Sequence, residues 1–239
     1  MNRWRADLDV LRAMLRGMPN SGPQQRRLEH FYSKQAADYD RFRQRLLPGR
    51  SELIASLPIA LGARVVELGA GTGSNVGLFS PMQQRECQFE LIDLCRPLLA
   101  EARRAHADKP NVRLIEGDAV TWQPDQPVDL VLMSYSLSMM PAPDLVVANA
   151  MRMLRPGGLL AVVDFYLSSA KAEPGRAQHS LAERLFWSRW FAHDGVVLGA
   201  ERLALVQDAC RESVLSERRH RLPYLPLLRV PYFLFRGQA

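Results

Sequence analysis

The sequence predicts an α/β fold in which a doubly wound sheet of about seven mostly parallel strands carries an N-terminal helical cap. Short apolar runs alternate with stretches of helical spacing between residues 62 and 167, which is typical of parallel strands joined by helical crossovers. A glycine-rich turn follows the first of these runs. We therefore expect a helical cap over 1–60, a sheet core over 61–167, and a substrate-side helix with C-terminal strands over 168–239 that completes the same domain.

Five strands and their connecting helices can be assigned in chain order. The expected strands are 64–68, 89–93, 112–116, 128–133 and 159–164. The segments 97–107 and 143–154 have the length and spacing of crossover helices. Beyond the core, residues 181–191 predict an aromatic helix. The tail 222–235, rich in proline and aromatic residues, predicts one or two added strands.

Composition narrows the class of protein. The chain of 239 residues has 47% hydrophobic composition, which is enough for one sizeable core. No apolar run approaches the roughly 18 residues needed to span a bilayer, and the N-terminus is too charged to begin a signal peptide. The cysteines form no CxxC pair or evident disulfide framework, and the histidines lack the spacing of metal ligands. We therefore expect a cytoplasmic protein without a metal site.

Positive charge is concentrated at both ends of the chain. Residues 1–50 hold 11 basic and 5 acidic residues, and residues 176–239 hold 10 and 6, whereas residues 51–175 hold 10 and 14. This asymmetry fits an anionic partner, such as a membrane surface, a nucleic acid or an acidic substrate, or it serves solubility alone. Near the N-terminus an apolar stripe at helical spacing lies beside arginines: Trp4, Leu8, Leu11, Leu15 and Met18, with Arg5, Arg12 and Arg16. The stripe predicts either a lid or a peripheral contact with an anionic membrane, at its inner face.

The glycine-rich turn carries the strongest functional signal. It runs Gly69-Ala70-Gly71-Thr72-Gly73 directly after an apolar strand, and glycine is needed where backbone must approach a ligand closely. A bare GxGxG is weak evidence, because nicotinamide enzymes use a similar turn. Three acids add to it. Glu67 precedes the turn, Asp93 ends the next strand, where it can accept hydrogen bonds from ribose hydroxyls, and Asp118 follows the third, where it can accept from an adenine amino group.

Over residues 60–167 these features resemble the Rossmann-like class I S-adenosylmethionine-dependent methyltransferases, and the turn at 154–159 is also similar. The resemblance implies S-adenosyl-L-methionine as cofactor and S-adenosyl-L-homocysteine as product. It implies that the glycine turn contacts the methionine moiety, that Asp93 binds the ribose, and that Asp118 and Ala119 lie beside adenine. We also assign Tyr32, Leu94 and Ser134 to the cofactor site.

Other stretches resemble a narrower group, the bacterial N-methyltransferase of betaine-lipid synthesis and the corresponding half of the fused eukaryotic enzyme. The similar stretches are 31–43, 133–141, 190–196 and 230–235. This resemblance implies threefold methylation of the amino group of diacylglyceryl-homoserine. The alternatives are another acceptor (a quinone, another small amine or phosphatidylethanolamine), a non-catalytic nucleotide-binding module, or a nicotinamide oxidoreductase. Nucleic acid is not expected as a substrate, because Ser134-Tyr135-Ser136-Leu137 replaces an Asn/Asp-Pro-Pro-Tyr tetrapeptide.

Aromatic side chains are the expected surface for a methylated amine, since their faces attract cations. The candidates are Tyr32, Tyr39, Tyr135, Tyr166, Trp187 and Trp190, with core packing as the alternative role. Tyr39 and Tyr135 come first, because their positions border the methyl group in this fold. His193 beside Asp194 either relays a proton from the incoming ammonium or is structural. The expected catalytic residues are thus Tyr39, Tyr135 and His193.

Overall fold

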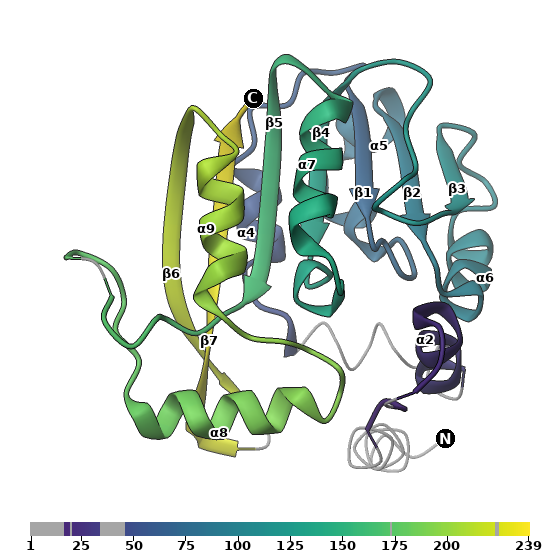
Figure 1. The fold of residues 1–239 in the computed structure, drawn as a ribbon. Coiled ribbons are helices and arrows are strands. Elements are labelled where there is room, and N and C mark those ends of the chain that lie inside the picture. Colours follow the sequence, from purple (N-terminus) through teal and green to yellow (C-terminus); the bar gives the residue numbers. More distant parts are fainter. Residues whose placement is uncertain (1–16, 20, 34–45, 173, 223–224) are drawn as a thin grey trace.

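The computed structural model describes residues 17–19, 21–33, 46–172, 174–222 and 225–239, with backbone only for 225–227. Its centre is a seven-stranded sheet of order β3-β2-β1-β4-β5-β7-β6, in which β1 to β5 run parallel and β7 runs antiparallel to both neighbours (Figure 1). The strands are β1 (Arg64–Leu68), β2 (Gln88–Asp93), β3 (Val112–Glu116), β4 (Val128–Ser134), β5 (Leu154–Phe165), β6 (Glu212–Leu222) and β7 (Leu225–Gln238).

The chain runs outward from β1 to β2 and β3 and then crosses back to place β4 on the other side of β1, so the strand order reverses beside β1. Ligands of open α/β sheets bind at such a reversal, outside the carboxyl ends of the strands. The fold therefore places a candidate site at the ends of β1, β2 and β4.

Helices cover both faces of the sheet. The helices of the described residues are α2 (Gln24–Tyr32), α4 (Arg50–Ala55), α5 (Pro81–Glu86), α6 (Arg96–Ala105), α7 (Pro143–Met153), α8 (Leu181–Ala192) and α9 (Ala200–Asp208), with short 3-10 turns η1 (Ser74–Leu78) and η2 (Leu137–Met139). Proline in the first turn starts α5, α6 and α7, where its missing N–H costs no hydrogen bond. In Figure 1, α7 and α9 cover one face of the sheet and α4 and α5 the other. Among the described residues, no helix has the length and hydropathy to cross a membrane.

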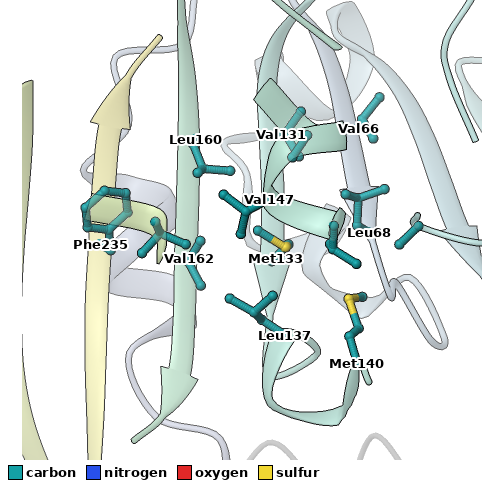
Figure 2. Close-up of a cluster of buried hydrophobic side chains, with 14 of the residues drawn as sticks. Val66, Leu68, Val131, Met133, Leu137, Met140, Val147, Leu160, Val162 and Phe235 are labelled. Atoms are coloured by element: carbon teal, nitrogen blue, oxygen red, sulfur yellow. The ribbon is translucent and has the colours of Figure 1, made fainter. Parts of the chain in front are cut away.

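Two apolar layers pack against the sheet because successive side chains of a strand point to opposite faces. Figure 2 shows the α7 side, where Val66 and Leu68 of β1 meet Val131 and Met133 of β4, together with Val147 of α7. The opposite layer buries the remaining strand residues against α4 and η1. Strands buried on both faces explain why the core strands are continuous apolar runs in the sequence.

The five expected core strands and the helices at 97–107, 143–154 and 181–191 are confirmed, with ends that differ by up to two residues apart from the longer β5. The tail forms β7, as expected, but its partner β6 covers Glu212–Leu222, a segment for which we predicted no strand. In the N-terminal part, α2 is described, whereas the stripe from Trp4 to Leu15 and residues 34–45, with Tyr39, lie outside the described residues.

Candidate cofactor and acceptor site

The glycine turn after β1 adopts backbone conformations that side chains disfavour. Gly69, Gly71 and Gly73 have φ of 74°, 59° and 70°. A Cβ at Gly69 would lie 2.5 Å from the Cβ of Ser136, so the loops that follow β1 and β4 touch at this point. The N–H of Gly69 donates to the carbonyl of Ile92 on β2 at 2.8 Å. The glycine turn is thus held by a hydrogen bond to the end of β2 and by close contact with the loop after β4.

Asp93 is fixed at the end of β2 by two backbone donors. Its Oδ2 accepts from the N–H of Gly71 and its Oδ1 from the N–H of Cys95, each at 2.7 Å. A carboxylate offers about four lone-pair sites, so these two bonds orient it and leave acceptor capacity. Asp93 therefore lies, as a pre-oriented acceptor, at the reversal point of the sheet.

A pocket, here named the Asp93 pocket, opens beside this carboxylate. The strand ends contribute Gly69, Asp93, Gly117, Asp118 and Tyr135, and α2 covers it with Gln24, Leu28 and Tyr32. Its charged lining residues within the described chain are Asp93 and Asp118. The Oδ1 of Asp118 accepts from the N–H of Val120 at 2.9 Å, which fixes the turn after β3. An apolar slot with an acid at each of two strand ends suits a nucleoside.

A smaller pocket, here named the Ser134 pocket, adjoins the first and shares Gly69 and Gly71 with it. The Oγ of Ser134 is buried there and has no hydrogen-bond partner among the described residues. Arg50, from α4, lines the same pocket and donates to the Oδ1 of Asn75 at 3.2 Å. A buried hydroxyl without a partner costs free energy unless a ligand or water pairs with it, so the pocket is suited to a polar ligand group.

Glu67 is the acid of the Ser134 pocket. It is buried, and the Nδ2 of Asn75 donates to its Oε1 at 2.7 Å. Burial raises the pKa of Glu67 to about 8, against the opposing effect of the Asn75 hydrogen bond and the Arg50 charge. An acid, a guanidinium and a hydroxyl within one small pocket match the amine and carboxylate of an amino acid.

The structure brings most of the expected cofactor residues together. The Asp93 pocket is lined by Tyr32, Gly69, Gly71, Asp93, Leu94, Asp118 and Ala119. The Ser134 pocket is lined by Glu67, Ala70, Thr72 and Ser134. Gly73 lines neither pocket; it starts η1, and its carbonyl lies 3.1 Å from the Nε2 of His106. Sequence reasoning missed Arg50 and Asn75, which belong to no recognisable motif.

Tyr135 is held in a strained conformation where β4 ends. Its φ is 54°, a left-handed value that costs a residue with a side chain about 1–3 kcal/mol. Its N–H donates to the carbonyl of Val163 at 2.8 Å, and its buried hydroxyl donates to the carbonyl of Pro48 at 2.7 Å. The ring centroid lies 4.6 Å from that of Phe165, which lies 4.8 Å from that of Phe191. An aromatic row thus begins at the wall of the Asp93 pocket.

The loop after Tyr135 is fixed by two buried charged residues that the sequence did not indicate. Asp164 ends β5 and accepts from the N–H and the Oγ of Ser138, at 2.8 and 2.7 Å. Burial raises the pKa of Asp164 to about 6, although these hydrogen bonds oppose the rise. From α9, the Nε of Arg202 donates to the carbonyl of Leu137 at 3.2 Å. Together they hold the loop that closes one wall of the Asp93 pocket.

The other expected acceptor residues are more scattered. His193 is exposed at the end of α8, where its ring lies against Gly17, and it is not among the lining residues of either pocket. Trp187 is buried against Leu167, which is the core-packing role, and Tyr166 is also buried and donates to Glu217 at 2.6 Å. The proton relay by His193 and the cage role of Tyr39 stay predictions. Within the described residues, no group of His, Cys, Asp or Glu is arranged to hold a metal ion.

Comparison with known proteins agrees with this geometry. Residues 65–158 match the family described as "Methyltransferase domain". A trans-aconitate 2-methyltransferase from Methylobacterium nodulans is 33% identical over 127 residues, which are 53% of this chain and 48% of that protein. The chain spans about half the length of the curated relatives it matches. The family match over residues 65–158 contains the glycine turn, Asp93, Asp118 and the end of β4.

Two solved structures share the fold across most of the chain. The N-methyltransferase NodS from Bradyrhizobium japonicum, in complex with S-adenosylhomocysteine, superposes with a TM-score of 0.57 at 16% identity and covers 98% of each chain. A phosphoethanolamine N-methyltransferase from Haemonchus contortus gives a TM-score of 0.68 at 14% identity, over 92% of this chain and 61% of that one. The fold is therefore Rossmann-like, and it is shared with solved methyltransferases. Residues 65–158 match the methyltransferase-domain family, and this match together with the NodS complex indicates S-adenosylmethionine as the cofactor.

The residues present fit this cofactor. The Asp93 pocket offers two acids and an apolar slot to the adenosine part. The Ser134 pocket offers Glu67, Arg50 and the unpartnered Ser134 hydroxyl to the amino-acid part. Because the glycine turn lines both pockets, it is the natural junction between the two parts of the cofactor.

Proposed function

We propose that this protein is an N-methyltransferase that methylates an amine, and that its acceptor is the amino group of diacylglyceryl-homoserine, methylated up to three times to a betaine lipid. The observation that carries the amine is the aromatic row Tyr135–Phe165–Phe191, whose first member lines the Asp93 pocket. Within the described chain that pocket has no Lys, Arg or His in its lining. Aromatic faces without neighbouring cations favour an ammonium over a carboxylate. The homoserine lipid rests on the sequence resemblance.

The proposed chemistry needs alignment more than acid–base groups. S-adenosylmethionine supplies an electrophilic methyl group on a positively charged sulfur. The chain binds both partners, excludes water and holds the amine lone pair in line with the methyl carbon. Each transfer leaves a methylammonium, which must lose its proton before the next transfer, and the third leaves a permanent cation. The aromatic row beside the loop that Asp164 holds at Ser138 is the part of the described structure suited to the positive charge of the methylated amine.

A carboxylate acceptor is the second candidate, favoured by the trans-aconitate 2-methyltransferase relatives. A tricarboxylate would need several cationic partners. In the two pockets Arg50 is the described cationic residue, and it lies in the Ser134 pocket, where the amino-acid part of the cofactor would bind. We therefore rank this candidate below the amine.

The deciding experiment offers labelled S-adenosylmethionine with one acceptor at a time: diacylglyceryl-homoserine, phosphatidylethanolamine and trans-aconitate. Mass spectrometry of the products should show one, two and three methyl groups added to the homoserine lipid. Transfer to trans-aconitate alone would overturn the proposal in favour of the second candidate. Transfer to phosphatidylethanolamine alone would support methylation of an amine but would overturn the homoserine lipid as the acceptor. Cofactor binding without transfer to any amine would overturn the N-methyltransferase itself.

A further inference from the structure

Helix α8 is apolar on most sides but buries few of its side chains. Trp187 is its one buried residue, packed with Leu167 and Val230. Four large apolar side chains of α8 are exposed, by 66%, 59%, 41% and 40% respectively: Leu181, Leu185, Phe186 and Trp190. We name these four residues the α8 face. A helix that is apolar all round is normally buried, and a contiguous exposed apolar patch marks an interaction surface.

The α8 face lies at the functional end of the molecule. Figure 1 shows α8 crossing below the carboxyl ends of the parallel strands, the end at which both pockets open. Aromatic contacts link it to the site. The ring centroid of Phe186 lies 4.9 Å from that of Trp187, and Trp187 lies 5.8 Å from Phe191. Phe191 in turn contacts Phe165, which contacts Tyr135. The loop after α8 joins the same region, because the N–H of Val197 donates to the carbonyl of Ser138 at 2.9 Å.

The exposed charge on α8 itself is basic. The other exposed residues of α8 are Ala182, Ser188, Arg189 and Ala192, so Arg189 is the one exposed charge on the helix. The acid of the helix, Glu183, forms an ion pair with Arg219 at 2.6 Å. Residues 176–239 hold 10 basic residues against 6 acidic ones. Leu, Phe and Trp at one surface, beside an arginine whose stem can extend along apolar groups, are typical of a helix at a lipid headgroup boundary.

We propose that the α8 face docks on a lipid bilayer that contains anionic lipids, with its apolar side chains in the headgroup boundary and Arg189 on a lipid phosphate. A second copy of the chain is a poorer occupant. In a two-fold pair the same face meets itself, so two Arg189 side chains would approach with no exposed acid of α8 to compensate them. The proposal goes beyond the methyl transfer proposed above and depends on no particular acceptor.

The test measures binding of the full chain to vesicles, without cofactor or acceptor, by co-sedimentation. We expect binding to vesicles of phosphatidylcholine with phosphatidylglycerol, weakened by salt. The variant Leu185→Ser/Phe186→Ser/Trp190→Ser should bind at least tenfold more weakly. The matched control is Leu61→Ser/Met82→Ser, which removes side chains 50% and 54% exposed elsewhere and should bind like the wild type. Circular dichroism and the melting temperature check that both variants fold. We expect both to fold, because the substituted side chains are exposed.

Three results would overturn the proposal. The first is equal vesicle binding by the wild type and the α8 variant, or none by either. The second is a dimer of the wild type in light scattering that the α8 variant converts to monomer, because a second copy would then cover the face. The third is loss of binding in Leu8→Ser/Leu11→Ser but not in the α8 variant, which would assign the contact to the N-terminal stripe. None of these readouts involves methyl transfer, so they leave the proposed enzymatic activity to its own test.

Discussion

The ends of β1, β2 and β3 and the ends of β4 and β5 form two halves of one site, but they are built differently. In the first half, short-range backbone contacts do the work: the bonds that fix Asp93 reach 2 and 22 residues along the chain. In the second half, the bonds come from far away: Tyr135 reaches Pro48 across 87 residues, and Arg202 reaches Leu137 across 65. The half that depends on contacts close in the sequence can be recognised from the sequence alone. The half that depends on distant contacts can be recognised only in the folded structure.

The largest expected effect tests the contact between the two halves. In Gly69→Val, the new Cβ would overlap Ser136, and the φ of 74° disfavours valine. Both pockets share this glycine, so we expect affinity for S-adenosylhomocysteine to fall by at least 100-fold, about 2.7 kcal/mol, in calorimetry.

The control for this substitution is Gly62→Ala. Gly62 has a φ of 80°, but a Cβ there would meet nothing within 4 Å. This change should lower stability by about 1–2 kcal/mol and leave cofactor affinity unchanged. Equal affinity losses in the two variants would mean that left-handed backbone strain, rather than the contact between the halves, sets the binding.

The second prediction concerns the first half alone. Asp93→Ala removes the acceptor expected for the ribose and releases the N–H groups of Gly71 and Cys95. We expect cofactor affinity to fall by about 1–3 kcal/mol, or roughly 5- to 150-fold. Calorimetry with S-adenosylhomocysteine measures this loss, and Asp118→Asn, which keeps an oxygen to cap the turn at Val120, should lose less. Wild-type affinity in Asp93→Ala would remove the ribose assignment.

This difference between the two halves of the site explains which parts of the structure could be predicted from the sequence. Buried parallel strands are continuous apolar runs, and strand ends locate Asp93 and Asp118, so the core and the cofactor acids were predictable. Arg50 and Asp164 gain their roles from partners in other elements, and no spacing in the sequence announces such contacts.

β6 was missed for a related reason. It is the edge strand of the sheet, paired with β7 alone, and most of its residues are exposed or half-exposed. Its sequence, ESVLSERRHRL, is rich in charge, as edge strands that resist further pairing tend to be. Such a pattern looks like a polar loop until its apolar partner strand is known.

The third prediction uses pH to test the buried acid of the Ser134 pocket. The pKa of Glu67 is about 8 in the folded protein and near 4.5 in the unfolded chain, so between these values the folded state holds the extra proton. Stability should therefore fall as pH rises from 4.5 to 8, by on the order of 1 kcal/mol for each pH unit at most. Glu67→Gln keeps an acceptor for Asn75 but has no charge to bury, so its unfolding free energy should exceed that of the wild type increasingly toward pH 8.5.

Urea titrations at pH 6 and pH 8.5 measure this difference. The exposed Glu86→Gln is the control and should follow the wild type at both pH values. Asp164, whose pKa is raised to about 6, adds a slope of the same sign that ends at lower pH, and His179, whose pKa is lowered by burial, adds a slope of opposite sign. Both slopes are present in the wild type and in Glu67→Gln, so the difference between these two proteins isolates Glu67. An advantage of Glu67→Gln over the wild type that does not grow from pH 6 to pH 8.5 would contradict the burial of a protonated Glu67.

The smallest expected effect separates the hydroxyl of Tyr135 from its ring, and so tests what the second half contributes. Tyr135→Phe deprives the carbonyl of Pro48 of its donor and should cost about 1 kcal/mol of stability, as should Tyr166→Phe at Glu217. Because the hydroxyl is already committed to Pro48, we expect Tyr135→Phe to change turnover only a few-fold. Tyr135→Leu removes the aromatic face instead, and the third methylation, which turns a tertiary amine into a fixed cation, should slow most. Mass spectrometry would then show dimethylated product accumulating in Tyr135→Leu alone; a wild-type product distribution in that variant would leave the aromatic row a packing feature of the loop.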